Sequence, residues 1–383
     1  MRINWFLILL AYSGLFFYGL VDNSRGPVFP DILATFQLSD SMGSVFFFLG
    51  SFAATMANAT AFIWLKRWPA LVSFRFFICL QTFGLAIVAW GPTYSVVLVG
   101  VFFFGLSLGG YGLLVNVLAS EASVGDTRRR VIAGLHAMYG VSSLIAPLAV
   151  TLIYSFNGTW RTVLGGLGVL PLIVVFISFF RRPSVVYASP KTDTQSSISF
   201  KAAFPYVAMI GIYVLAEVLL STRIVLYARR ELGYTSEDAN FLLSGFFMAL
   251  FAGRIAFTMF RLKTTTRRLL ILSAAGGLGF YMLGLLVHPL AFVGCGLSFS
   301  FFYPCAMADV GDKLGADRAA VVMSWIQTFQ SLAIMSMHFT MGLLSDHFGL
   351  NRAMWLGVGA MIVVMILLWR RVSLGESSQA ASV

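Results

Sequence analysis

Two carboxyl groups interrupt runs of sequence that are otherwise apolar. Asp22 lies within the run 5–30, and Glu217 lies in the middle of a second run, 204–228. An ionisable group inside a membrane-spanning segment is costly, and it usually faces the interior of a helix bundle or a water-filled cavity. Carboxyl groups in such places can act as proton relays. We therefore predict that Asp22 and Glu217 take up and release protons.

The neighbours of the two carboxyl groups differ. Arg25 follows Asp22 by three residues, so the two share a helix face and can form an ion pair. Tyr213 lies one turn before Glu217 on the same face, whereas Arg223 follows by six residues and faces elsewhere. Two structural alternatives stay open. One is a neutral ion pair that only fixes helix packing, and the other is a protonated Glu217 bonded to a neighbouring backbone.

Other polar side chains in the apolar runs could bind a neutral solute rich in hydroxyl groups. Amide and imidazole groups donate and accept hydrogen bonds, and aromatic rings could pack on the apolar face of a sugar. The candidate substrate-binding residues are Asn116, His136, Tyr18, Tyr213, Gln327, Gln330 and Trp325. Gln327 and Gln330 are three residues apart and so share a helix face. The structural alternative is hydrogen bonding between helices.

Charged residues near the ends of two apolar runs suggest a gate. Glu121 and Asp309 end such runs beside basic loops. We predict that each pairs with a nearby arginine, for instance Arg129 or Arg130. Arg254, which lies within another run, is predicted to serve as a similar latch.

The composition excludes several classes of protein. Apolar residues make up 59% of the 383 residues, and only 11% are charged, against about 25% in an average soluble domain. This excludes an ordinary soluble enzyme and a disordered chain. The net charge of +11 does not indicate a nucleic-acid partner, because the basic residues are scattered between apolar runs. No metal-ligand spacing, nucleotide-binding loop or catalytic motif is present, so we expect neither an enzyme nor a cofactor.

Twelve runs are long enough to cross a bilayer, which takes about 20 mostly apolar residues. We therefore predict an all-α membrane protein with twelve transmembrane helices. The runs are 5–30, 42–65, 72–90, 94–120, 130–155, 160–180, 204–228, 240–260, 267–287, 289–311, 319–344 and 352–370. We predict an N-terminal six-helix bundle over 1–180, a cytoplasmic linker over 181–203, and a C-terminal six-helix bundle with a short cytoplasmic tail over 204–383.

The basic residues predict the orientation in the membrane. Of the 26 Lys and Arg residues, nineteen fall on the side where both termini lie, four on the other side, and three within the runs. Because Lys and Arg are enriched in cytoplasmic loops, we predict that both termini are cytoplasmic. The expected location is the cell membrane, with a bacterial inner membrane as the favoured case.

The two halves of the chain resemble each other. Tyr18 and Asp22 fall on Tyr213 and Glu217 at an offset of 195 residues, and Val-Gly-Asp at 124–126 falls on Val-Gly-Asp at 310–312 at a shorter offset of 186. Matches in the same order and at the same topological places indicate an internal repeat. We therefore predict two pseudo-symmetric six-helix bundles, an arrangement found in secondary transporters.

Four stretches of the chain carry a family resemblance. They are Gly19–Pro30, Gly109–Pro147, Tyr213–Arg254 and Gly296–Asp346. Together they resemble the fucose/glucose permease branch of the major facilitator superfamily. The resemblance implies sugar uptake coupled to a cation, usually a proton, by alternating access.

The resemblance also implies roles for single residues. Glu217 matches the glutamate common in the seventh span of that branch. His136 and Asn116 match its histidine in the fifth span and its asparagine in the fourth.

The expected function is proton-coupled symport of a small polar solute, a sugar or polyol, by a monomer in a lipid bilayer. The coupling ion could also be sodium. One alternative is a proton-coupled exporter of drugs or metabolites on the same fold, and a less favoured one is a membrane sensor that does not transport.

Overall fold

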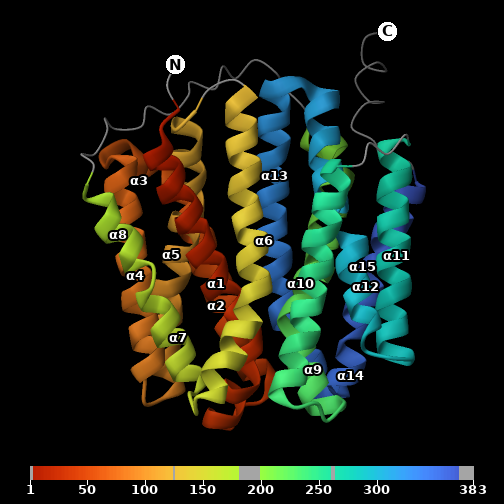
Figure 1. The fold of residues 1–383 in the computed structure, drawn as a ribbon. Coiled ribbons are helices and arrows are strands. Elements are labelled where there is room, and N and C mark those ends of the chain that lie inside the picture. Colours follow the sequence, from red (N-terminus) through yellow and green to blue (C-terminus); the bar gives the residue numbers. More distant parts are fainter. Residues whose placement is uncertain (1–2, 124–125, 181–198, 260–263, 371–383) are drawn as a thin grey trace. The chain divides into compact units, whose positions relative to one another are not determined.

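The computed structural model describes residues 3–123, 126–180, 199–259 and 264–370. Every regular element within these ranges is an α-helix (Figure 1). The helices are α1 (Trp5–Phe36), α2 (Asp40–Ala59), α3 (Ala61–Arg67), α4 (Ala70–Trp90), α5 (Tyr94–Glu121), α6 (Asp126–Ser155), α7 (Trp160–Val169), α8 (Leu172–Ser178), α9 (Phe200–Glu231), α10 (Ser236–Met259), α11 (Thr266–Leu286), α12 (Ala291–Phe299), α13 (Phe302–Phe348), α14 (Leu350–Ala353) and α15 (Trp355–Trp369).

Eleven helical segments in the described ranges are long and apolar enough to cross a membrane. They coincide with eleven of the twelve predicted spans, which confirms the all-α membrane fold. The remaining predicted span, 319–344, is helical within α13 but is not among the eleven. Its polar side chains, including Gln327, Gln330 and His338, lower its hydropathy below that of the other spans.

The boundary predicted between residues 311 and 319 is wrong, because α13 is one continuous helix of 47 residues. Charged residues such as Asp312 and Lys313 lower hydropathy there, but they do not break a helix. The chain breaks instead at Ser300 and Phe301, inside the predicted span 289–311. Pro304 explains that position, because it has no backbone N–H for the carbonyl group four residues earlier.

Helix α1 is longer than predicted. It continues from Trp5 to Phe36, through Pro27 and Pro30 and beyond the predicted end at residue 30. Membrane helices tolerate proline where neighbouring helices shield the freed backbone groups, and both prolines are buried. The helix begins where the side chain of Asn4 accepts the backbone N–H of Leu7 at 3.3 Å.

The chain forms two compact units. The N-terminal unit comprises Met1–Pro190 with Gly233–Ser244, and the C-terminal unit comprises Lys191–Leu232 with Gly245–Val383. The first two turns of α10 therefore belong to the N-terminal unit and the rest of that helix to the C-terminal unit. The bundle boundaries predicted at residues 180 and 204 flank a range that the structure does not describe, and they stay a prediction.

Within the N-terminal unit, α1 packs against α5 and α6, and α5 packs against α2 and α4 (Figure 1). Small residues allow the closest approaches. A Cβ atom at Gly105 of α5 would collide with the backbone of Gly50 of α2, and one at Gly109 would collide with the backbone of Ala54. Within the C-terminal unit, α9 packs against α13 and α15, while α11 packs against α12 and α15.

Candidate functional site

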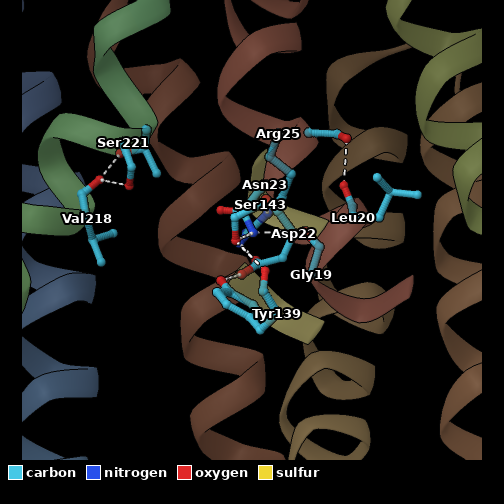
Figure 2. A network of polar contacts seen from close by, with 11 residues as sticks. Gly19, Leu20, Asp22, Asn23, Arg25, Tyr139, Ser143, Val218 and Ser221 are labelled. Atoms are coloured by element: carbon cyan, nitrogen blue, oxygen red, sulfur yellow. Dashed lines mark hydrogen bonds and ion pairs between the residues drawn. The ribbon is translucent and has the colours of Figure 1, made fainter. Parts of the chain in front are cut away.

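An ion pair lies inside the N-terminal unit. Arg25 Nη2 of α1 donates to Asp22 Oδ1, one turn earlier on the same helix, as the spacing predicts. Tyr139 of α6 donates its hydroxyl group to the other carboxylate oxygen, Oδ2, at 2.9 Å (Figure 2). The side chains of Arg25 and Asp22 are only 13% and 17% exposed. Both carboxylate oxygens of Asp22 therefore have a donor, which suits the ionised form.

Aromatic rings hold the Arg25 guanidinium group. Its central carbon lies 5.6 Å from the ring centre of Phe47 and 5.5 Å from that of Phe104. Arg25 Nε also donates to the backbone carbonyl group of Asp22 at 3.1 Å. Cation–π contacts and hydrogen bonds thus fix the cation beside its partner.

The same face of α1 is joined to α6 by uncharged groups. Asn23 Nδ2 donates to Ser143 Oγ of α6 at 3.0 Å and to the carbonyl group of Gly19 at 2.8 Å (Figure 2). A Cβ atom at Gly19 would collide with Ser142 of α6, so the two helices approach closely at this level. The polar cluster is therefore built between two tightly packed helices.

The substrate-binding candidates of the N-terminal unit do not all gather at this cluster. The ring of Tyr18 lies 6.1 Å from that of Tyr139 and 5.8 Å from that of Tyr111. Asn116 Nδ2 instead donates to the carbonyl group of Gly112 in its own helix, at 2.8 Å. His136 lies on α6 with its side chain exposed. Tyr18 thus joins the Asp22 cluster, whereas the roles of Asn116 and His136 stay predictions.

Glu217 lies at a second charged site, in the C-terminal unit. Its carboxyl oxygen Oε2 is 2.8 Å from Tyr213 Oη, one turn earlier on α9 as predicted. Its other oxygen, Oε1, is 3.8 Å from Arg254 Nη2 of α10. The side chain of Glu217 is 19% exposed and that of Arg254 is 34% exposed. Arg254, predicted as a gate latch, therefore stands beside Glu217.

Tyr213 joins Glu217 to the break between α12 and α13. Its hydroxyl oxygen lies 2.7 Å from the carbonyl oxygen of Phe299, the last residue of α12. Its ring stacks on Phe302, the first residue of α13, with 4.0 Å between ring centres. The Tyr213 side chain is fully buried. The sequence did not predict this contact, because the helix break that creates it was not predicted either.

The two glutamines of α13 lie in different surroundings. Gln327 Nε2 donates to Tyr303 Oη at 3.1 Å, and its side chain is exposed. Gln330 Oε1 is buried and has no hydrogen-bond partner among the described residues. Trp325 packs edge-on against Phe200 of α9, with 5.1 Å between ring centres. Tyr303 is thus a polar neighbour that sequence reasoning missed.

The predicted gate residues differ from expectation in one respect. Asp309 lies inside α13 rather than at a helix end, and it pairs with Lys313 at 2.8 Å instead of an arginine. It also accepts a hydrogen bond from Tyr206 of α9 at 3.0 Å. Lys313 lies one helical turn further on, so spacing within the helix explains the partner.

The gate roles of Glu121, Arg129 and Arg130 stay predictions. Glu121 is exposed at the last residue of α5, and Arg130 is exposed on α6. The side chain of Arg129 lies outside the described residues. In the described part of the chain no group of three His, Cys, Asp or Glu side chains could hold a metal ion.

Comparison with protein families identifies the fold. The model of the Major Facilitator Superfamily matches residues 11–337. The chain belongs to the major facilitator superfamily. That membership makes it a transporter by family and confirms the superfamily predicted from the sequence. A search of curated proteins finds no match.

Solved structures of transporters share the fold. A bacterial homologue of the human lysosomal transporter Spinster is 14% identical, with 96% of this chain and 97% of that chain covered and a TM-score of 0.78. A D-xylose–proton symporter is 13% identical over 96% and 98% of the two chains, with a TM-score of 0.78. The nucleoside transporter NupG is 12% identical over 95% and 99%, with a TM-score of 0.76.

Proposed function

We propose that this protein is a secondary active transporter that takes up a small neutral polar solute, a sugar or polyol, together with protons. The observation that carries the proposal is Glu217, a carboxyl group inside a membrane-spanning helix, with a tyrosine hydroxyl group 2.8 Å away and an arginine 3.8 Å away. Such intramembrane groups serve as proton relays when water can reach them. Its side chain is 19% exposed, and we infer that water reaches it there.

Glu217 is a better proton carrier than Asp22. Asp22 is bonded directly to Arg25 and receives a second donor from Tyr139, and protonation would break that pair. Arg254 lies farther from Glu217, beyond the 2.7–2.9 Å expected for a charge-assisted hydrogen bond. Glu217 is therefore less closely paired with its arginine than Asp22 is. We assign proton coupling to Glu217, with the Asp22–Arg25 pair as the fixed charge centre of the N-terminal unit.

The preference for a hydroxyl-rich solute rests on the uncharged groups of α13. Gln327 and Tyr303 form a hydrogen-bonded pair, and Gln330 offers a buried carbonyl oxygen that no described residue satisfies. A hydroxyl group of a substrate could donate to that oxygen. The resemblance to the fucose/glucose permease branch supports a sugar, and the similar fold of a D-xylose–proton symporter is consistent with it.

Orientation and location are part of the same proposal. The excess of Lys and Arg on one side supports cytoplasmic termini and a multi-pass protein of the cell membrane. Alternating access would follow from movement of two six-helix repeats.

A ligand screen tests the proposed function. Purified protein is heated with sugars, polyols, nucleosides or amino acids at two pH values. A ligand at 100 times its Kd adds about 2.7 kcal/mol of stability, which is a readily measured rise in Tm. The stabilising solute is then added outside proteoliposomes that contain a pH-sensitive dye. We expect the lumen to acidify. A solute that binds and enters without proton movement would contradict the proposed coupling.

A further inference from the structure

The break between α12 and α13 lies within a membrane-spanning segment, Ala291–Leu314. Helix α12 ends at Phe299, and α13 begins at Phe302. The last carbonyl groups of a helix have no partner within that helix. Water cannot replace those partners in the bilayer core, so the protein itself must supply donors.

Three side-chain hydroxyl groups supply donors to consecutive carbonyl groups at this break. Ser300 Oγ lies 2.7 Å from the carbonyl oxygen of Leu297, Ser273 Oγ lies 2.5 Å from that of Ser298, and Tyr213 Oη lies 2.7 Å from that of Phe299. Serine hydroxyl groups donate to the carbonyl groups of Leu297 and Ser298, and no charged group takes part in either contact. Only the third cap involves an ionisable group, because Tyr213 also contacts Glu217.

The hydroxyl group of Tyr213 lies between two acceptors but carries one hydrogen. Glu217 Oε2 is 2.8 Å away on one side, and the Phe299 carbonyl oxygen is 2.7 Å away on the other. An ionised carboxylate has only lone pairs to offer, so one of these contacts would then be repulsive. Both contacts are hydrogen bonds when Glu217 is protonated. Its O–H then donates to Tyr213 Oη, and Tyr213 donates to Phe299.

The surroundings of Glu217 are consistent with a neutral carboxyl group. Among the described residues, the charged or titratable groups that face it are Arg254 of α10, Tyr213 of α9 and Tyr303 of α13; Cys295 of α12 lies near Tyr213. Arg254 is the only cation in that set, and its Nη2 stays 3.8 Å from the carboxyl oxygen. That distance lies within the range of an ion pair, but it is longer than a charge-assisted hydrogen bond, so Arg254 does not donate directly to the carboxyl group.

We propose that Tyr213 is a positioning residue that links the protonation of Glu217 to the capping of the break between α12 and α13. When Glu217 releases its proton to solvent, the Tyr213 hydroxyl hydrogen turns to the carboxylate, and the Phe299 carbonyl group loses its donor. The stacked ring of Tyr213 need not move, because only the hydroxyl hydrogen reorients. The break then becomes free to rearrange. This inference rests on the proposed role of Glu217 as the proton carrier.

Helix α10 also reaches this break. A Cβ atom at Gly253 would collide with Ser300, so the backbone beside Arg254 lies directly against the break. A shift of the break would therefore displace the backbone of α10 beside Arg254. Direct contacts therefore connect the Glu217 carboxyl group, the Arg254 region of α10 and the break between α12 and α13.

Infrared difference spectroscopy tests the hydrogen-bond chain without any substrate. Spectra of the purified protein are recorded as a function of pH, and the band of the protonated Glu217 carboxyl group is assigned by its loss in Glu217→Gln. We expect Tyr213→Phe to shift that band, because the acceptor of the carboxyl proton is removed while the ring stack is kept. The proposal would be overturned if no Glu217 carboxyl band appeared at any pH at which the protein is stable. It would also be overturned if Tyr213→Phe left the band unchanged.

Amide hydrogen exchange around residues 300–305 tests the effect on the break. After correction for the intrinsic pH dependence, we expect exchange in the wild type to become roughly tenfold faster once Glu217 ionises. Glu217→Gln should exchange slowly at every pH, since its amide can donate to Tyr213, and Tyr213→Phe should exchange fast at every pH. Tyr281→Phe is the matched control, because Tyr281 of α11 packs on Phe292 of α12. We expect this variant to exchange like the wild type.

The outcomes separate this inference from the proposed function. Loss of proton-driven transport in Glu217→Gln, together with an unchanged band and unchanged exchange in Tyr213→Phe, would keep the function and reject the Tyr213 link. A shifted band and altered exchange in a protein that moves no protons would keep the link and reject the coupling. If Tyr213→Phe does not fold, slow, pH-independent exchange in Glu217→Gln supports the link, and wild-type exchange in that variant rejects it.

Discussion

Asp22 and Glu217 occupy equivalent places in the sequence repeat, but their surroundings give them different chemistry. Asp22 is bonded to a guanidinium group on one oxygen and a tyrosine hydroxyl on the other. Glu217 shares its tyrosine with a backbone carbonyl group and keeps its arginine at 3.8 Å. We therefore propose that Asp22 serves as a fixed partner of Arg25, whereas Glu217 exchanges its proton. This difference can be tested by stability alone.

Removing the charge of Asp22 should destabilise the protein strongly. Asp22→Asn leaves the buried cation of Arg25 without its counter-charge, which typically costs about 3–5 kcal/mol. Replacing both, as Asp22→Asn with Arg25→Gln, should cost less than Asp22→Asn alone. Glu217→Gln should cost less than about 1 kcal/mol, because the glutamine amide can replace the protonated carboxyl group that we propose for Glu217. Thermal unfolding of the four proteins in detergent measures these differences, and a similar loss in both single variants would contradict the assignment.

A buried hydroxyl group outside these sites offers a second prediction. Tyr281 Oη is buried and has no hydrogen-bond partner among the described residues. Tyr281→Phe removes an unsatisfied polar group and keeps the ring, so we expect stability to be unchanged or raised by about 1 kcal/mol. Tyr111→Phe is the contrasting variant, because its hydroxyl donates to the Gly14 carbonyl group at 2.7 Å. A larger loss in Tyr281→Phe than in Tyr111→Phe would contradict this reasoning.

At the scale of single elements, the sequence predicts the helices better than their breaks. Hydropathy located the spans, and spacing paired Asp22 with Arg25 and Tyr213 with Glu217, because those contacts form within one helix. Tyr139 and Arg254 come from other helices, and no pattern within one sequence states which helices pack together. The break at Ser300 did have a signal, since Pro304 lies inside an apolar run.

Gly311 of α13 and Gly105 of α5 lead to opposite predictions about stability. A Cβ atom at Gly311 would meet nothing within 4 Å, and Gly311 lies inside the continuous helix. Gly311→Ala should therefore stabilise the protein by about 0.5–1 kcal/mol. Gly105→Ala should instead destabilise it by about 1–3 kcal/mol, because the new methyl group collides with the backbone of Gly50. Thermal unfolding distinguishes them, and a destabilising Gly311→Ala would indicate that the helix ends there.

At the scale of the whole molecule, the distribution of basic residues predicts topology. Glu237, in the first turn of α10, should face outside, and Thr264, just before α11, should face the cytoplasm. Each position is changed to cysteine in a background in which the exposed Cys79 is replaced by serine and the buried Cys295 and Cys305 remain. Labelling of intact cells then reports the side on which the new cysteine lies. A membrane-impermeant reagent should label Glu237→Cys and spare Thr264→Cys. The reverse pattern would invert the proposed orientation.

The repeat explains why the fold could be predicted from the sequence while the substrate could not. Two six-helix halves produce repeated patterns of spacing, hydropathy and charge, which are properties of whole segments. Substrate preference depends on single groups such as Gln330 and Tyr303, whose neighbours come from distant parts of the chain. Those contacts appear only when the helices are packed.

Proton-driven accumulation in proteoliposomes tests the central claim most directly. A pH gradient of one unit supplies about 1.4 kcal/mol per proton, so coupled uptake of one neutral solute with one proton concentrates it about tenfold. We expect the wild type to reach such accumulation with the solute found by the ligand screen. Glu217→Gln should lose accumulation but still exchange labelled for unlabelled solute across the membrane. Accumulation by Glu217→Gln at the wild-type rate and level would contradict the account.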